Sequence, residues 1–248
     1  MKKSAVIITG ALGGIGSEMC RTFHAADFAV IAVDKREGEV PSAHFLCEDI
    51  QRCGASKEGI NNFAARVRNI LTEHDLELHG LINNAAVQIL GGCESQTHEG
   101  WHETLQVNLL APFFLAQAFL PELEAVNGAV VNVSSIHERL TKPQFIAYAT
   151  SKAALSGLTR ALAVDLGPRL RVNAICPAAI ETAMLKDGFT GDPEGYDALK
   201  SVHPVGRIGT PHEVARLCVY LVKEAPGFLT GATIGVDGGV ASRLHDPA

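Results

Sequence analysis

The chain has 248 residues, 47% of them hydrophobic, and a formal net charge of -6. This length suits one α/β domain, and the acidic balance gives no electrostatic reason to bind nucleic acid. The six cysteines show no paired spacing, which favours a reduced, cytoplasmic compartment over a disulfide scaffold. No apolar run reaches the roughly 18 residues of a membrane span. We therefore expect a soluble protein that binds neither nucleic acid nor a membrane.

Strand-like and helix-like segments alternate along the whole sequence. We expect strands at 4–9, 28–34, 43–47, 79–83, 128–134, 170–176 and 232–236, and helices at 14–26, 56–73, 101–125, 147–166 and 211–222. This alternation predicts the α/β class, as a single-domain Rossmann fold whose doubly wound, seven-stranded parallel sheet is flanked by helices. Such a sheet binds its ligand at the carboxyl ends of the strands.

The first expected strand leads into the sequence TGALGGIG at residues 9–16. A glycine turn between a strand and a helix is typical of a dinucleotide site. Gly10 lets the chain turn sharply, Gly14 lets the backbone approach the pyrophosphate, and Gly16 lets the helix pack against the strand. The spacing is looser than GxGxxG, so the turn by itself is also compatible with a loop that binds no ligand.

The second expected strand ends in an acid, Asp34. It lies close to the distance of about 20 residues past the glycines at which a carboxylate pairs with the adenosine ribose hydroxyls. Since the same carboxylate repels the 2′-phosphate of NADP, we predict NAD as the cofactor. Lys35 and Arg36 follow directly and could cradle that phosphate, which keeps NADP as an alternative.

Residues 98–102 read HEGWH, a literal match to the HExxH signature of zinc proteases. The zinc mechanism requires both histidines on one helical face and a third ligand downstream. Gly100 weakens a helix interior, and the stretch falls where a long helix is expected to begin. We therefore interpret His98 and His102 as side chains of a helix start and predict no metal.

Tyr148 and Lys152 stand four residues apart, and Tyr148 follows Ser135 by thirteen residues. On a helix the pair projects from one face. A lysine ammonium beside a phenol favours the phenolate, so we expect a tyrosine pKa below about 10. A tyrosine tuned in this way can exchange a proton with an alcohol or carbonyl, and the serine hydroxyl can hold the same oxygen.

From Thr9 to Gly239 the sequence resembles the short-chain dehydrogenase/reductase family, and in part the sugar dehydrogenases within it. The glycine turn matches the cofactor turn, NNAA at 83–86 matches the family's NNAG, and four side chains match the catalytic tetrad: Asn108, Ser135, Tyr148 and Lys152. Alanine replaces glycine at Ala86 and Ala178, which removes no chemistry. The resemblance implies cofactor binding by Gly10, Gly14, Ile15, Gly16, Asp34, Asp49, Ile50, Asn84, Ala85, Tyr148, Lys152, Pro177, Ile180 and Thr182.

The resemblance implies hydride transfer between NAD and a secondary alcohol or ketone, or a sugar hemiacetal and lactone. Tyr148 would be the acid/base, Lys152 would also hold the nicotinamide ribose, and Asn108 would position a water beside Lys152. We expect a small polar substrate such as a sugar or polyol, with Gln88, His137 and Ser135 as its contacts. An extended segment after Ser135 would point His137 into the pocket, although the histidine could also cap a loop.

Three other functions stay open. The D-3-hydroxybutyrate dehydrogenases carry a lysine three residues before the tyrosine, where this chain has Phe145, and Lys142 is displaced by three positions. A 3-oxoacyl carrier-protein reductase is a second alternative, and a dinucleotide-sensing regulator without turnover is a third.

Residues 178–204 form the one long stretch without a clear period, and we expect a substrate lid there. The helices expected near Trp101 and Tyr148 carry apolar residues on more than one face, so each requires a second packing partner. Members of the resembled family commonly pair such helices between subunits, and we expect a homotetramer.

Overall fold

The computed structural model describes residues 2–41 and 43–244. Seven parallel strands form one sheet in the order β3-β2-β1-β4-β5-β6-β7. This topology confirms the predicted fold class. The strands are β1 (Lys3–Thr9), β2 (Ala29–Asp34), β3 (Ala43–Cys47), β4 (Leu76–Asn83), β5 (Ala129–Val133), β6 (Arg171–Pro177) and β7 (Thr233–Val236).

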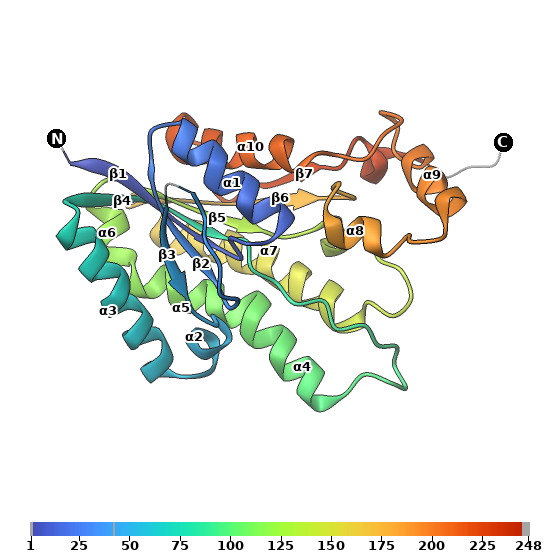
Figure 1. The fold of residues 1–248 in the computed structure, drawn as a ribbon, viewed down its shortest axis with the longest axis horizontal. Helices are drawn as coiled ribbons and strands as arrows, with labels where there is room; N and C mark the ends of the chain where they lie inside the picture. The colour runs from blue at the N-terminus through green and yellow to red at the C-terminus, as the bar shows by residue number, and fades with distance from the viewer. Residues whose placement is uncertain (1, 42, 245–248) are drawn as a thin grey trace.

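Helices cover both faces of the sheet (Figure 1). On one face lie α1 (Gly14–Ala25) and α10 (Pro211–Lys223), and on the other lie α3 (Lys57–Glu73), α5 (Ala111–Ala118) and α7 (Ile146–Leu166). The remaining helices are α2 (Gln51–Ala55), α4 (His98–Leu105), α6 (Leu120–Glu124), α8 (Ala183–Asp187) and α9 (Pro193–Ser201). None of the described helices is long and apolar enough to cross a membrane.

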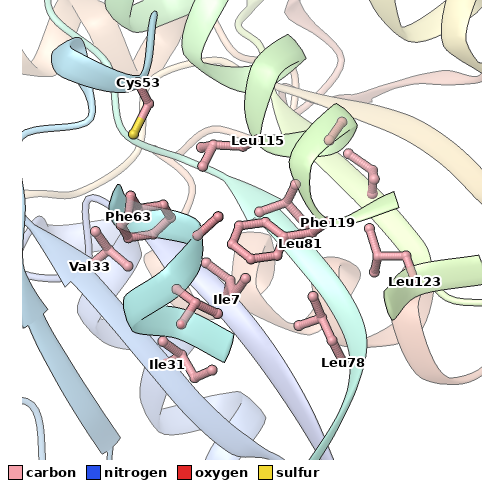
Figure 2. Close-up of a cluster of buried hydrophobic side chains, with 14 of the residues drawn as sticks. Ile7, Ile31, Val33, Cys53, Phe63, Leu78, Leu81, Leu115, Phe119 and Leu123 are labelled. Atoms are coloured by element: carbon pink, nitrogen blue, oxygen red, sulfur yellow. The ribbon is translucent and has the colours of Figure 1, made fainter. Parts of the chain in front are cut away.

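Each face of the sheet has its own buried cluster. Figure 2 shows the cluster between the sheet and α3, α5 and α6, with Phe63 and Phe119 at its centre. Their ring centroids are 6.0 Å apart at an interplanar angle of 83°, the edge-to-face arrangement that aromatic pairs prefer. The β-branched runs of the central strands are buried on both sides, as expected for a parallel sheet.

The single helix expected at 101–125 is wrong. The chain forms α4, then a π-helical segment from Gln106 to Leu110, then α5 and α6. The backbone stays helical from His98 to Ala118, with Pro112 just after the π-helical segment. Phe119 interrupts the helix, and Pro121 lies in the first turn of α6, where a missing N–H costs little. We call Gln106–Leu110 the π-turn.

The stretch at 178–204 is more ordered than its sequence pattern indicated, because it contains α8 and α9. The Asp192 side chain accepts a hydrogen bond from the Gly195 amide and so caps α9, and Pro193 follows in the first turn. Both helices lie beyond the carboxyl end of the sheet, on the side opposite the N-terminus (Figure 1).

Candidate active site

The glycine turn after β1 is held by side chains from β1 and the end of β4. Gly10 has a φ of +68°, and a Cβ at Gly16 would overlap the Gly10 carbonyl oxygen. The Thr9 hydroxyl accepts the backbone N–H groups of Asn84 and Ala85, each at 3.0 Å. The Asn84 amide donates to the Thr9 and Gly10 carbonyls at 2.9 and 3.2 Å. These bonds fix the turn between two neighbouring strands.

The N-terminus of α1 is open to a ligand. Gly13 is its N-cap and supplies no side-chain hydrogen bond, and the first turn contains no acid. Thr182, near Ile180 after β6, lies so close to Gly14 that a Cβ there would come within 2.8 Å of the threonine methyl. Free backbone N–H groups at a helix N-terminus bind phosphate well, so the glycine turn and the N-terminus of α1 fit the pyrophosphate of a dinucleotide.

Asp34 stands beside this turn at the end of β2, with its side chain 6% exposed. Its carboxylate accepts the Leu12 N–H at 2.9 Å and the Arg36 N–H at 3.1 Å, and the Arg36 guanidinium donates at 3.0 Å. Burial raises the pKa of Asp34, but hydrogen bonds from Arg36 and Leu12 outweigh it and hold the pKa below its ordinary value. Arg36 is therefore paired, whereas Lys35 is exposed.

The adenine end of the expected site follows β3. Ile50 is buried and Asp49 is half-buried, directly before α2. The Asp49 carboxylate accepts the Gln51 N–H at 3.0 Å, which orients the start of that helix.

The carboxyl end of β5 and the first turns of α7 bring Ser135, Tyr148 and Lys152 together. Lys152 is buried, and its ammonium donates to the Val133 carbonyl at 2.7 Å and lies 5.6 Å from the centroid of the Tyr148 ring. Burial lowers the pKa of Lys152 to about 8. Burial raises the pKa of Tyr148, which a hydrogen bond with Ser135 opposes. The expected lowering of the tyrosine pKa is thus wrong here, because desolvation outweighs any effect of the nearby ammonium.

Lys152 should make stability depend on pH. Its pKa in the folded state lies below the ordinary 10.5, so the unfolded chain binds more protons between the two values. The unfolding free energy of the wild type should therefore rise between about pH 8 and about pH 10 relative to Lys152→Met, and stay level below about pH 8, where both states are protonated. Urea denaturation across this range measures the difference. Two curves that stay parallel would contradict the shift.

Asn108 lies in the π-turn and is fully buried. Its carbonyl oxygen accepts the Val87 N–H at 2.9 Å, and its amide donates to the Val87 carbonyl at 2.9 Å and to the Ser151 hydroxyl at 3.0 Å. Ser151 precedes Lys152, so Asn108 joins the loop after β4 to the lysine's helix. Ser151 was not among the site residues predicted from the sequence, although its place three residues after Tyr148 puts it on a neighbouring part of the helix.

The segment after Ser135 is a 3₁₀ turn, Ile136–Glu138, so it does not have the extended geometry that would point His137 into the pocket. The Ser135 hydroxyl accepts the His137 N–H at 3.2 Å and closes the turn. His137 nevertheless reaches Tyr148: their ring centroids are 5.6 Å apart, and His137 is stacked on Phe145 at 4.6 Å. Its Nδ1 lies 3.2 Å from the Thr141 hydroxyl. Burial and the positive charge of Lys142 both lower the pKa of His137.

Comparison with known proteins identifies the family. Residues 10–241 match the family described as Enoyl-(Acyl carrier protein) reductase. The chain is 32% identical to human dehydrogenase/reductase SDR family member 4, with 98% of this chain and 90% of the relative covered. The chain belongs to the short-chain dehydrogenase/reductase family. It is therefore an NAD(P)-dependent oxidoreductase that acts on alcohol and carbonyl groups.

Other similar family members differ in substrate and cofactor. An NAD-dependent glycerol dehydrogenase of Listeria innocua is 31% identical (94% of this chain and 92% of the relative). The ligand-free aldohexose dehydrogenase of Thermoplasma acidophilum has a TM-score of 0.90 at 29% identity (100% and 97%). A 4-hydroxyisoleucine dehydrogenase with NADH has a TM-score of 0.84 at 26% identity (97% and 100%). ElxO with NADP has a TM-score of 0.85 at 26% identity (98% and 100%).

His98 and His102, the histidines of the HExxH match, lie in α4. The helix begins at His98, and the Thr97 hydroxyl caps it by accepting the Gly100 N–H at 3.0 Å. Among the residues that the structure describes, no three His, Cys, Asp or Glu side chains are grouped as metal ligands. In this short-chain dehydrogenase/reductase His98 is the first residue of the capped helix, and His102 lies in its last turn.

Proposed function

We propose that the protein is an NAD-dependent dehydrogenase that interconverts a secondary alcohol and a ketone, or a sugar hemiacetal and a lactone. The supporting observation is the grouping of Ser135, Tyr148 and Lys152 at the carboxyl end of the sheet, beside an uncapped helix N-terminus. Ligands of doubly wound sheets bind at this edge. Formation of NADH from NAD and a candidate alcohol, with Tyr148→Phe as the control, tests the proposal.

In the proposed mechanism Tyr148 takes the hydroxyl proton of the alcohol during oxidation and returns a proton to the carbonyl oxygen during reduction. Ser135, whose hydroxyl acts to lower the pKa of the tyrosine, orients the same oxygen. Asn108 binds Ser151, next to Lys152 on α7, and Lys152 would contact the nicotinamide ribose. When bound, the nicotinamide accepts or donates the hydride, and the positive charge of its oxidised form favours the Tyr148 phenolate.

The preference for NAD over NADP is supported by Asp34. Its carboxylate is buried and charged at the position where the adenosine ribose would lie. A 2′-phosphate there would meet like charge, and Arg36 is already paired with the carboxylate. Asp49, Ile50, Pro177, Ile180 and Thr182 complete the proposed cofactor contacts.

The proposed substrate is small and carries several hydroxyl groups, as a sugar or polyol does. The Nδ1 of His137 is held by Thr141, so Nε2 is the ring nitrogen available to a substrate hydroxyl. Gln88 is exposed just after the end of β4 and adds a neutral amide. The similarity to an aldohexose dehydrogenase and a glycerol dehydrogenase supports this substrate class.

A hydroxy acid is the second candidate, because Lys142 comes closer to the site than its sequence position indicated. Its ammonium lies 4.6 Å from the centroid of the Phe145 ring, and that ring is 6.1 Å from Tyr148. A cation at this place could bind a carboxylate.

Lys142→Met distinguishes the two substrate classes. We expect KM for the best sugar or polyol to change by less than about twofold, since a neutral substrate makes no ion pair. Lys57→Met, which removes an exposed lysine at the start of α3, is the matched control. A KM that rises about tenfold in Lys142→Met alone, with a hydroxy acid as the best substrate, would favour the second candidate.

The proposal includes the lid and the assembly. Residues 178–204 act as the lid, since Thr182 already touches the glycine turn at Gly14.

The protein is a homotetramer in this account, and the exposed Val164 of α7 and Leu110 beside α5 supply apolar surface for subunit contacts. Light scattering of the purified protein gives the mass, and a monomer would rule out this assembly.

A further inference from the structure

The short helix α2 packs directly on the π-turn. Gly54 of α2 faces the backbone hydrogen bond in which the Ala111 N–H donates to the Gln106 carbonyl, the bond that closes the π-turn. A Cβ at Gly54 would overlap that carbonyl oxygen and come within 3.0 Å of the Ala111 nitrogen. The Gln51 side chain also donates to the Gln106 side chain at 2.9 Å. A close backbone approach and a side-chain bond therefore join the two elements.

The π-turn determines where Asn108 points. A π-turn contains one more residue than the α-helical path, and a return to α-helix would rotate the following side chains by about 100°. In the observed register Asn108 makes its three hydrogen bonds to Val87 and Ser151. Any contact that favours the π register therefore also favours this orientation of Asn108.

The other end of α2 adjoins the proposed adenine site. Asp49 and Ile50 directly precede α2, and the Asp49 carboxylate accepts the N–H of Gln51, the same residue that bonds the π-turn. Cys53 of α2 and Leu115 of α5 belong to one buried cluster, so α2 is anchored against the helix that follows the π-turn (Figure 2). One helical turn thus connects the adenine side of the site with Asn108.

We propose that Gln51, Gly54 and Gln106 are positioning residues for Asn108, and that an adenosine group bound beside Asp49 and Ile50 stabilises the π-turn through α2. This inference rests on the proposed function for the role of Asn108 and for the place of the adenosine. Binding at one end shifts the other only if the two are energetically coupled, and that coupling can be measured.

Gly54→Ala should reduce kcat by about tenfold or more, because the added methyl group displaces the π-turn and with it Asn108. The KM for the alcohol should change by less than about twofold, since the substrate contacts are untouched. Gln51→Ala and Gln106→Ala each remove only one neutral hydrogen bond and should each cost about fivefold in kcat. The double variant should cost no more than either single variant, because both remove the same bond. Arg52→Ala, an exposed residue on the same helix, is the control and should match the wild type.

A second readout does not depend on turnover. Hydrogen exchange of the peptide around residues 104–112 is measured with and without saturating ADP-ribose, whose binding is followed by calorimetry. ADP-ribose should slow exchange in the wild type and Arg52→Ala, and slow it much less in Gln51→Ala. Bound ADP-ribose without any effect on wild-type exchange would overturn the coupling even if the enzyme turns over. ADP-ribose that fails to bind would instead contradict the proposed function on which the inference rests.

Discussion

Tyr148→Phe should reduce kcat by about 10³-fold, because the variant lacks the group that exchanges a proton with the alcohol. The ring itself should stay in place, since its contacts with His137 and Phe145 involve the ring and not the hydroxyl. We expect the Kd for NAD to change by less than about twofold. Steady-state kinetics and calorimetry of the same preparation measure both quantities.

Tyr220→Phe is the matched control, since Tyr220 lies on α10 with 39% of its surface exposed and should tolerate the change. Retention of wild-type turnover by Tyr148→Phe would disprove the proposed role of the tyrosine. A loss of both turnover and NAD binding would show that the substitution had damaged the cofactor site instead.

Asp34→Ala should reverse the cofactor preference. The carboxylate makes charge-assisted hydrogen bonds worth about 1.5–3 kcal/mol each, so its loss should lower kcat/KM for NAD by about 10- to 100-fold. The Arg36 guanidinium, now paired at 3.0 Å with Asp34, would then be free to bind the 2′-phosphate of NADP. The ratio of kcat/KM for the two cofactors is the measured quantity.

Two further variants test the explanation. Glu37→Ala removes a neighbouring exposed acid and should leave the cofactor ratio unchanged if position matters more than net charge. Arg36→Ala in the Asp34→Ala background should remove the increase in kcat/KM for NADP. An unchanged ratio in Asp34→Ala would contradict the assignment of the adenosine ribose to this carboxylate.

The fold could be predicted because the central parallel strands, which are buried on both faces, produce continuous apolar runs that alternate with helix-like segments along the chain. Asp34 was predicted at the end of the second strand, and it lies there, buried, in the structure. The π-turn could not be predicted, since inserting one residue hardly alters the apolar pattern of 101–125. Pro121 is the sequence signal for the helix end before α6, where the predicted helix ran on to residue 125.

Predictions about charge and local geometry were less successful. The YxxxK spacing indicated proximity of Tyr148 and Lys152, but a spacing carries no information about desolvation, which sets the direction of both pKa shifts. The sequence left open whether the segment after Ser135 is extended, and it is a turn because the serine hydroxyl accepts a hydrogen bond from the His137 N–H. His137 still lies beside Tyr148, and its role as a substrate contact stays a prediction.

NADH formation across a panel of aldoses, polyols, hydroxy acids and sterols, each with NAD and with NADP, tests the central claim most directly. The account predicts turnover of a sugar or polyol with NAD, absent in Tyr148→Phe. Turnover only with NADP, or only of a hydroxy acid or sterol, would contradict the proposed cofactor or substrate. An absence of turnover across the panel while NAD binds would contradict the proposed dehydrogenase activity on these classes.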